Sequence, residues 1–395
     1  MAIKFAERMD NLKASEIREL LKLTERPEVI SFAGGLPAPE LFPIEEMKKV
    51  AVMVLEESGR QALQYSATEG YTPLREKILK RMEPIGISGK AENVLITSGS
   101  QQGLDFSGKI FINPGDVVIC ESPSYLGAIN AFKAYSPKFV EVTTDDNGMD
   151  MDELEKVLET TDNVKMIYVI PDFQNPSGRT WSVDRRKKLV ELANRFDLPI
   201  IEDNPYGELI FEGDRKPSIK SFDTEGRVVF LGTFSKTFCP GLRIGWVFAD
   251  QELLQKYILV KQGADLQSNS MAQRELDKFL ELNDLDAHVD KIKDVYRRRR
   301  DVMLNTMKEH FPKGVKYTYP TGGLFTWVEL PAHLNAREVF VKAIEVNVAF
   351  VPGGSFYPNG GNENTFRLNY SNMTEDKIKE GIVRLGRVLA EMINE

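Results

Sequence analysis

A lysine lies between two apolar segments of the chain, beside side chains that could bind a phosphate group. Residues 228–231 and 244–249 are apolar runs on either side of Ser235-Lys236, so Lys236 is expected in a turn between two buried strands. A lysine in a partly dry site favours its neutral amine, which can attack an aldehyde. Ser235 and Arg243 supply donors and a fixed positive charge suited to phosphate. This combination favours pyridoxal phosphate, although a Ser-Lys pair alone is more often a solvated loop.

The elements that would position Lys236 form an alternating pattern. Between about residue 92 and residue 250, apolar strand-like runs alternate with helical patterns, which is typical of a mostly parallel α/β sheet. Ligands of such sheets bind outside the carboxyl ends of the strands, so the residues that follow each strand are the candidates for a site. The strand candidates are residues 93–97, 116–120, 165–170, 198–201, 227–231 and 245–249.

Two of these strand ends carry groups suited to a phosphate and a flat ring. Ser100 and Gln101 follow the first strand and open a helical pattern, and a helix N-terminus is a ready phosphate site. Tyr125 follows the second strand, and its ring could lie against a planar cofactor. Each signal has an ordinary structural alternative, a helix cap for the first and core packing for the second.

The next strand ends carry groups suited to the polar edge of the same ring. Asn175 follows the third strand and could donate its amide to a ring oxygen. Asp203 ends the fourth strand, where a buried carboxylate is costly unless it meets a cation such as a protonated pyridine nitrogen. Tyr206 could donate to the ring hydroxyl. The order of these groups along the chain supplies the contacts that pyridoxal phosphate needs.

Composition excludes several other classes of function. The 395 residues carry a net charge of −8, which argues against a broad nucleic-acid surface, and the basic run 297–300 is expected to be a solvated helix face. No run of about 20 apolar residues is present, so no membrane span is expected. Two cysteines and three scattered histidines predict neither a disulfide framework nor a metal site, and they favour the cytoplasm.

The chain resembles the fold-type I pyridoxal phosphate aminotransferases of class I, in particular the branch that contains the 2-aminoadipate, kynurenine and aromatic aminotransferases. The resemblance spans nearly the whole chain and keeps the family's motif order. The motifs are Ser31-Phe-Ala-Gly-Gly35-Leu-Pro, Gln64-Tyr65-Ser-Ala-Thr-Glu-Gly-Tyr71, Thr97-Ser-Gly-Ser-Gln101-Gln, Gln174-Asn175-Pro-Ser-Gly178, Glu202-Asp203-Asn-Pro-Tyr206, Ser235-Lys236, Pro240-Gly-Leu-Arg243 and Phe366-Arg367-Leu-Asn-Tyr370.

The resemblance implies an α/β fold of the fold-type I class. A large domain would hold a mostly parallel seven-stranded sheet between helices, and a smaller α+β domain would follow it. The expected divisions are an N-terminal arm and substrate-gating helix at 1–40, which packs with the small domain, a large cofactor-binding domain at 41–285, and a small domain at 286–395.

The resemblance also implies a role for each candidate residue. Lys236 would bond the cofactor's aldehyde and carry the proton, Asp203 would pair with the ring nitrogen, and Arg367 would bind the substrate α-carboxylate. The cofactor contacts would come from Ser100, Gln101, Tyr125, Asn175, Tyr206, Ser235 and Arg243, and from Tyr65 of the neighbouring subunit in a homodimer with shared sites.

The amino-group acceptor is expected to be 2-oxoglutarate, used in a ping-pong reaction. Donor specificity would depend on Ser15 and Arg18, which lie three residues apart on one face of a predicted N-terminal helix. In the 2-aminoadipate branch, the matching residues contact a distal carboxylate. Gly35 would let the backbone approach the substrate closely.

Two other functions fit part of the same pattern. A pyridoxal phosphate decarboxylase or lyase on this scaffold differs only in which bond at the substrate Cα is aligned for cleavage. An effector module of an aminotransferase-like transcription regulator would carry a DNA-binding domain, but about thirty residues precede Gly34-Gly35, too few for one.

Overall fold

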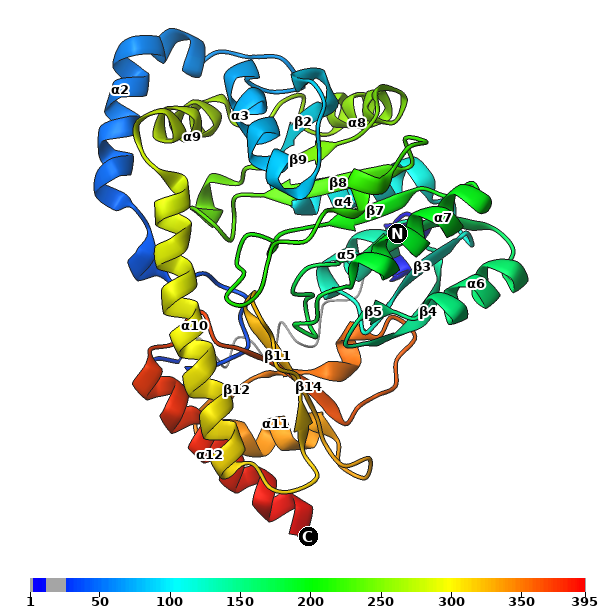
Figure 1. Ribbon diagram of the computed structural model, residues 1–395, viewed down its shortest axis with the longest axis vertical. Helices are drawn as coiled ribbons and strands as arrows, with labels where there is room; N and C mark the ends of the chain where they lie inside the picture. Colours follow the sequence, from blue (N-terminus) through cyan, green and yellow to red (C-terminus); the bar gives the residue numbers. More distant parts are fainter. Residues whose placement is uncertain (1–2, 12–25, 395) are drawn as a thin grey trace.

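The computed structural model describes residues 3–11 and 26–394. Its main sheet has eight strands, which follow one another from β2 near the top of Figure 1 to β4 and β5 at the middle right. Neighbouring strands are parallel except at β9 and β5, which run antiparallel to their neighbours. In spatial order the strands are β2 (Val94–Thr97), β9 (Gly245–Phe248), β8 (Val228–Thr233), β7 (Ile200–Asp203), β6 (Val164–Val169), β3 (Val117–Ser122), β4 (Lys138–Asp145) and β5 (Gly148–Met149).

The sheet has one strand more than the seven expected. The additional strand is β5, a two-residue return from β4 at the edge of the sheet. Strand β4 itself was absent from the strand candidates, because only one of its eight residues is buried and its sequence does not form a continuous apolar run. The mostly parallel α/β architecture is confirmed.

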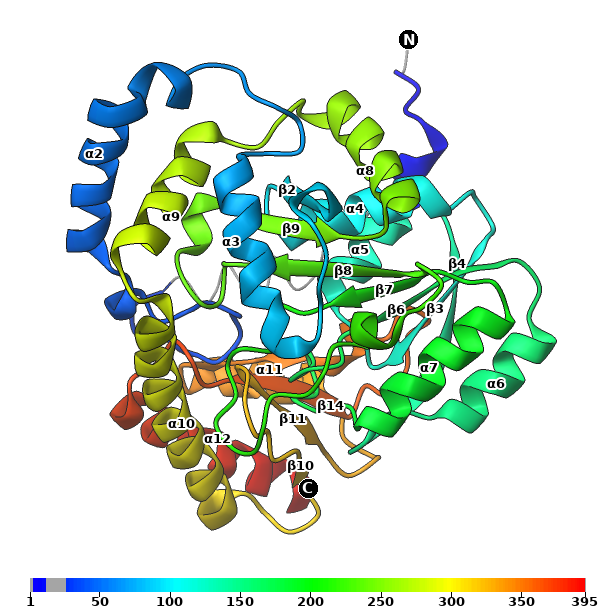
Figure 2. The same ribbon diagram turned by 45° about the horizontal axis from the view of Figure 1, so that its top comes forward.

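Helices cover both faces of this sheet because its central strands are buried on both sides. Alternate residues of each strand enter two separate cores: Ile119 and Ile167 pack toward α6 and α7, whereas Cys120 and Tyr168 pack toward α4, α5 and α8. Figure 2 shows α6 and α7 side by side on one flank. The helices of this part are α2 (Ile44–Ala62), α3 (Thr72–Met82), α4 (Ser100–Phe111), α5 (Leu126–Lys133), α6 (Met151–Thr160), α7 (Val183–Arg195), α8 (Gln251–Ala264) and α9 (Ser270–Leu282).

A second, smaller layer of strands and helices lies below the main sheet in Figure 1. Its four-stranded antiparallel sheet has the order β10-β11-β14-β13, and the short strand β1 near the N-terminus pairs in parallel with β12. The expected domain limits at residues 40 and 285 remain a prediction. The elements are β1 (Ile30–Ser31), α10 (Leu285–His310), β10 (Lys316–Tyr317), β11 (Phe325–Glu329), α11 (Ala336–Glu345), β12 (Val348–Ala349), β13 (Val351–Pro352), β14 (Thr365–Asn369) and α12 (Glu375–Asn394).

Helix α10 links the two layers, and its basic run is only partly solvated. Arg297 and Arg298 are exposed as expected, but Arg299 and Arg300 are buried. Arg300 donates to the Pro320 carbonyl and pairs with Glu212 of the main layer. The expectation of a solvated face is therefore wrong for two of the four arginines. Acidic partners on other elements, which the run itself does not reveal, neutralise them.

Among the helices of the described residues, none combines the length and apolar character needed to cross a bilayer.

Candidate active site

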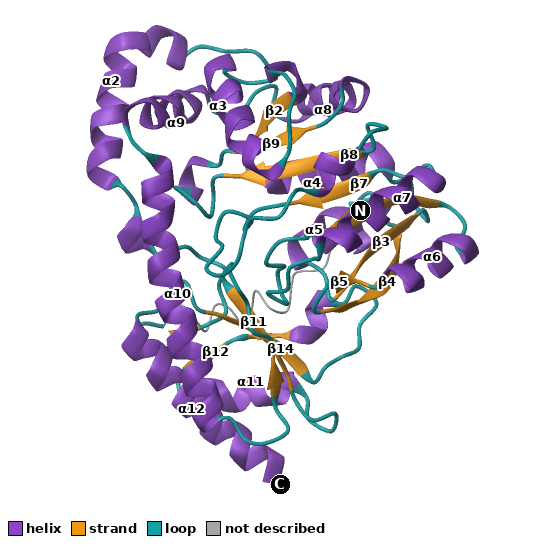
Figure 3. Cartoon of the chain, in the orientation of Figure 1, coloured by secondary structure: helices purple, strands orange, loops and turns teal. Residues whose placement is uncertain are grey.

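The loops that follow the parallel strands gather between the main sheet and the smaller sheet, as Figure 3 shows. Asp203 is the last residue of β7, and Ser235-Lys236 follows the end of β8. Arg367 reaches the same region from β14 of the smaller layer. Residues that are far apart in the sequence therefore meet at one edge of the sheet, as expected for this architecture.

Lys236 is held in a partly buried position with a weakened preference for its charged form. Its Nζ donates to the Gly35 carbonyl oxygen at 2.8 Å. Burial, together with the positive charges of Arg367 and Arg243, lowers the pKa of Lys236 to about 8. About a tenth of this amine is therefore neutral at pH 7, far more than of an ordinary lysine, which favours its use as a nucleophile or a proton carrier.

Asp203 is a buried carboxylate with one oxygen left free. Only 1% of its surface is exposed, and its Oδ2 accepts a hydrogen bond from the Tyr168 hydroxyl at 3.0 Å. Its Oδ1 has no hydrogen-bond partner among the described residues. Burial raises the pKa of Asp203 to about 7, while the Tyr168 hydrogen bond acts in the opposite direction. An unpaired buried carboxylate oxygen is costly, and a cationic N–H donor would satisfy it.

Arg367 presents a buried guanidinium whose fork is only partly used. Its two terminal nitrogens donate to Asn175 Oδ1 and to the Ala33 carbonyl, each at 2.6 Å, whereas its Nε has no partner in the described part of the chain. The rings of Phe325 and Phe356 lie 4.3 and 5.1 Å from its central carbon. Burial lowers the pKa of Arg367 to about 10, and the group remains charged at neutral pH. It can bind an anion.

Asn175 joins this arginine to Tyr206. Its Nδ2 donates to the Tyr206 hydroxyl at 3.4 Å, while its Oδ1 accepts from Arg367. The Tyr206 ring packs edge-on against Phe325, with centroids 5.8 Å apart. Burial raises the pKa of Tyr206, so its hydroxyl stays protonated and able to donate. Tyr125, at the start of α5, is close enough to Asp203, Arg367 and Arg243 that their charges shift its pKa, whose net direction is upward because burial dominates.

The N-terminus of α4 lies against the loop that follows Lys236. Ser100 begins this helix, and Gly99 precedes it with φ +78°. A Cβ at Gly99 would lie 2.3 Å from Arg243 Nη2, so only glycine lets the guanidinium approach. Arg243 Nη1 lies 3.5 Å from Ser235 Oγ. Free backbone N–H groups, a hydroxyl and a guanidinium together form a cradle for an anion.

Of the predicted residues, Tyr65 and Gln101 are not assembled into this cluster, and two others lie outside the described residues. Tyr65 is 79% exposed on the surface of the single chain. Ser15 and Arg18 lie outside the described residues. Gln101 is exposed next to Ser100, and its side-chain amide donates to the Gly127 carbonyl rather than to Ser235 or Arg243.

Sequence reasoning missed some contributors to the site. Tyr168 lies in the apolar run of β6, where a buried hydroxyl needs a partner, and this was the available signal. The Ala33 carbonyl and the rings of Phe325 and Phe356 carry no pattern that the sequence could reveal, since their role comes from the packing of the two layers.

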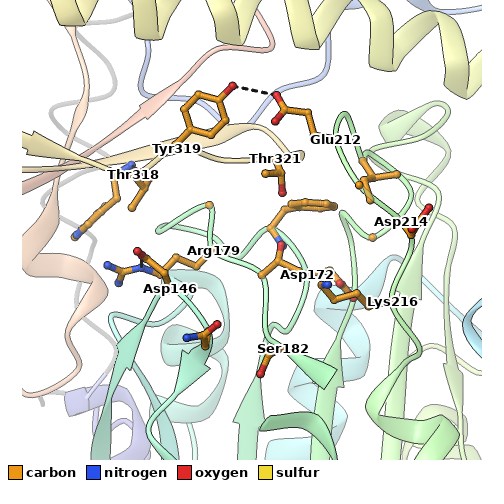
Figure 4. A pocket seen from close by; sticks show the side chains of 18 of the residues that line it. Asp146, Asp172, Arg179, Ser182, Glu212, Asp214, Lys216, Thr318, Tyr319 and Thr321 are labelled. Atoms are coloured by element: carbon orange, nitrogen blue, oxygen red, sulfur yellow. Dashed lines mark hydrogen bonds and ion pairs between the residues drawn. The ribbon is translucent and has the colours of Figure 1, made fainter. Parts of the chain in front are cut away.

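A separate cleft of about 780 Å³ opens between the two layers, as Figure 4 shows. None of the predicted site residues lines it. Its walls carry both signs of charge, including an ion pair of 3.1 Å between Arg179 and Asp146 and a hydrogen bond of 3.1 Å from Tyr319 to Glu212. These groups satisfy one another, so we do not place the chemistry there.

The residues present fit pyridoxal phosphate. The free oxygen of Asp203 suits a protonated ring nitrogen, and the Ser100, Ser235 and Arg243 cradle suits a phosphate. The amine of Lys236, with its lowered pKa, suits an aldehyde. In contrast, no group of three or more histidine, cysteine, aspartate or glutamate side chains within the described ranges could hold a metal ion.

Fold and site together define a pyridoxal phosphate enzyme of the fold-type I class. Residues 28–385 match the model of the family "Aminotransferase class I and II", and the chain belongs to that family. It is therefore a pyridoxal phosphate-dependent aminotransferase, and the decarboxylase, lyase and regulator alternatives are set aside.

Relatives and solved structures agree over almost the whole chain. The chain is 47% identical to aromatic-amino-acid aminotransferase 1 of Thermococcus litoralis, over 98% of this chain and 94% of that protein. It is 45% identical to 2-aminoadipate transaminase of Thermus thermophilus, over 98% and 97%. The structure of Pyrococcus horikoshii kynurenine aminotransferase, in complex with PMP, matches with a TM-score of 0.95 at 43% identity, covering 98% of this chain and 97% of that chain.

Proposed function

We propose that this enzyme moves the amino group of an L-amino acid to 2-oxoglutarate in two successive half-reactions at one site. The donors we expect are 2-aminoadipate, glutamate and aromatic or branched-chain amino acids. The names of the relatives support the aromatic and 2-aminoadipate donors, since they cover aromatic amino acids, 2-aminoadipate and kynurenine. The observation that carries the proposal is the free, buried Oδ1 of Asp203 in the same cluster as the partly neutral amine of Lys236.

The candidate residues divide into cofactor-binding and substrate-binding groups. When bound, pyridoxal phosphate withdraws electrons from the substrate Cα. From positions around one cluster, Asp203 would stabilise the protonated ring nitrogen, Tyr125 would contact the ring and Tyr206 would donate to the ring hydroxyl. Ser100, Ser235 and Arg243 would hold the phosphate, together with Gln101 at the start of α4.

The substrate is oriented by Arg367 and Asn175. The terminal nitrogens of Arg367 bind the α-carboxylate as a fork, and burial among Phe325 and Phe356 keeps water away from that contact. Gly35 lets the backbone lie close, since a Cβ there would be 3.0 Å from the Phe325 ring. Lys236 Nζ then takes the proton from the substrate Cα and later returns one, as general base and acid.

We further propose a homodimer in which Tyr65 contributes to the partner's site. Tyr65 and Leu63 are more than 75% exposed in the single chain, and the nearby helix α2 exposes Val52 and Leu55. Apolar side chains that gather on one surface mark an interface. Cys120 and Cys239 are free, which supports a reducing compartment such as the cytoplasm.

Substrate choice is assigned to Ser15 and Arg18, as the resemblance implies. An arginine that reaches the distal carboxylate of an acidic donor would favour 2-aminoadipate and glutamate over neutral donors. The test compares kcat/KM across a panel of amino donors with 2-oxoglutarate, for the wild type and for Arg18→Ala. An unchanged preference for acidic donors would remove Arg18 from this role.

Replacement of Lys236 tests the proposed function itself. Wild-type protein incubated with pyridoxal phosphate should show visible absorption. Borohydride reduction should then leave the cofactor covalently attached, as a label, to the peptide that contains Lys236. In Lys236→Ala we expect no fixed label and a fall in transamination by about 10²-fold or more, since the proton carrier is gone. Retained labelling or near-normal turnover in this variant would refute the assignment.

A further inference from the structure

One buried tyrosine contacts the site without a role in the family-based assignment. Tyr168 lies near the carboxyl end of β6, and its hydroxyl donates to Asp203 Oδ2 at 3.0 Å. Both residues are 1% exposed. Strand register explains the contact: Tyr168 is paired with Ile201 of the neighbouring strand β7, and Asp203 lies two residues further along β7 on the same face. A long side chain reaches such a diagonal neighbour.

The position of Tyr168 is itself fixed. Its ring packs edge-on against Phe132 of α5, with centroids 5.5 Å apart and an angle of 78° between the rings. Neighbouring strands hold β6 on both sides, through Cys120 of β3 and Ile201 of β7. The hydroxyl therefore has little freedom to choose another acceptor, so the hydrogen bond restrains the carboxylate rather than the tyrosine.

The two oxygens of Asp203 consequently differ. Oδ2 is occupied by Tyr168, whereas Oδ1 has no partner among the described residues. A hydrogen bond to one oxygen fixes rotation of the carboxyl group and favours its ionised form. We propose that Tyr168 is a positioning residue that orients Asp203 and keeps it ionised, with Oδ1 directed toward the cofactor ring nitrogen. This inference rests on the proposed role of Asp203.

The electrostatic surroundings of Asp203 make its protonation sensitive to this one contact. The titratable groups that face it are Tyr168 from β6, Tyr125 from the start of α5 and Tyr206 from the loop after β7. Burial raises the pKa of Asp203 to about 7, and the Tyr168 hydrogen bond opposes that rise. Removal of the hydroxyl should thus raise the pKa again, and Asp203 should protonate at a higher pH.

The variant Tyr168→Phe tests this role, with Tyr257→Phe as the matched control. Tyr257 is also fully buried and hydrogen-bonded, but its partner is Ser107 rather than a carboxylate. We expect Tyr168→Phe to bind pyridoxal phosphate roughly tenfold more weakly at pH 8, and to lose binding at a higher pH than wild type on acidification. Tyr257→Phe should lose stability without either change.

A second measurement separates this inference from the proposed function. Infrared difference spectra of the full chain without cofactor follow the Asp203 carboxyl band, identified by its loss in Asp203→Asn. Its titration midpoint should be higher in Tyr168→Phe than in wild type and in Tyr257→Phe. Equal midpoints, or equal cofactor affinities in the two phenylalanine variants, would overturn the role of Tyr168. Failure of the wild type to bind pyridoxal phosphate through Lys236 would instead overturn the proposed function.

Discussion

At the scale of single residues, the site works by placing charged groups where water cannot stabilise them. Lys236 and Asp203 are ordinary side chains whose pKa values move toward neutrality because each is buried, to about 8 and about 7. Arg367 is buried as well, yet it keeps its charge and lowers the pKa of Lys236. A lysine that titrates near the working pH can gain and lose a proton during each turnover, whereas Asp203 is proposed to stay ionised.

The pKa of Lys236 predicts how cofactor capture depends on pH. Only the neutral amine attacks an aldehyde, so the capture rate should rise with pH through about 8 and then level off. Arg367→Gln removes a nearby positive charge, which should raise the pKa of Lys236 and move this midpoint to higher pH. Stopped-flow absorbance after addition of pyridoxal phosphate, recorded across a pH series, measures the capture rate and its midpoint in the wild type and in the variant. The control is Arg195→Gln, which removes an arginine of surface ion pairs. Equal midpoints in the two variants would contradict the prediction.

Geometry as well as charge matters at Arg367, and Arg367→Lys separates the two. Lysine keeps the charge but cannot form the fork, so we expect KM for amino donors to rise roughly tenfold or more. Cofactor affinity should change little. Steady-state kinetics and a cofactor titration provide the comparison. Arg75→Lys is the matched control, since Arg75 is another buried arginine that donates to backbone carbonyls. A similar KM in both variants would argue against the carboxylate contact.

At the scale of elements, the site depends on how closely β9 approaches the start of α4. Gly245 begins β9, and a Cβ there would lie 2.6 Å from the Ser100 backbone nitrogen. The absence of a side chain brings the N-terminus of α4 next to the loop that carries Ser235 and Arg243. A strand glycine is thus part of the anion cradle although it bears no functional group.

Gly245→Ala should therefore weaken both folding and cofactor binding. Overpacking at a close backbone contact costs about 1–3 kcal/mol of unfolding free energy. The displaced helix start should also lower affinity for pyridoxal phosphate. In Gly263→Ala, by comparison, the new methyl group meets nothing within 4 Å in α8, so stability should be unchanged or slightly higher. Denaturant unfolding and cofactor titration provide the measurements. Wild-type affinity in Gly245→Ala would show that the cradle tolerates the shift.

Periodicity predicted the strands that are buried on both faces, and with them the positions of Asp203 and Lys236 at strand ends. It did not predict β4, because most residues of this strand are partly or fully exposed and no continuous apolar run results. Nor did it predict that Arg299 and Arg300 are buried, because their partners come from elements far away in the chain. Local sequence patterns predict which face of an element is buried. The ion-pair partners of a side chain depend instead on how several elements pack.

At the scale of the whole molecule, residues of both layers and of the N-terminal segment build one site. Arg367 comes from the smaller sheet, Asn175 from the main layer, and the Ala33 carbonyl from the segment between β1 and α2. A relative shift of the layers would therefore separate the substrate-binding fork from the catalytic lysine. In the proposed homodimer, the exposed Tyr65 would extend the same principle to a second copy of the chain.

Mixed dimers test whether Tyr65 completes the partner's site. Tyr65→Ala and Lys236→Ala should each have low activity alone. After the two are unfolded and refolded together, about a quarter of the wild-type activity should return, because half of the dimers are mixed and each mixed dimer has one intact site. Sedimentation measures the oligomeric state, and a transamination assay measures the recovered activity. Activity that only equals the average of the two parents would contradict shared sites.

The sequence by itself determined the order of chemical groups along the chain and the α/β architecture that carries them to one edge of a sheet. Periodicity and strand-end position are local properties, and they are readable before folding. Only the tertiary structure decided which polar atoms of the site lack a hydrogen-bond partner among the described residues. The unpaired Oδ1 of Asp203 and the restraint from Tyr168 arise from the register of β6 against β7, and the pKa values follow from burial by both layers. Burial and register are properties of the packed molecule, since they depend on every element that surrounds the group.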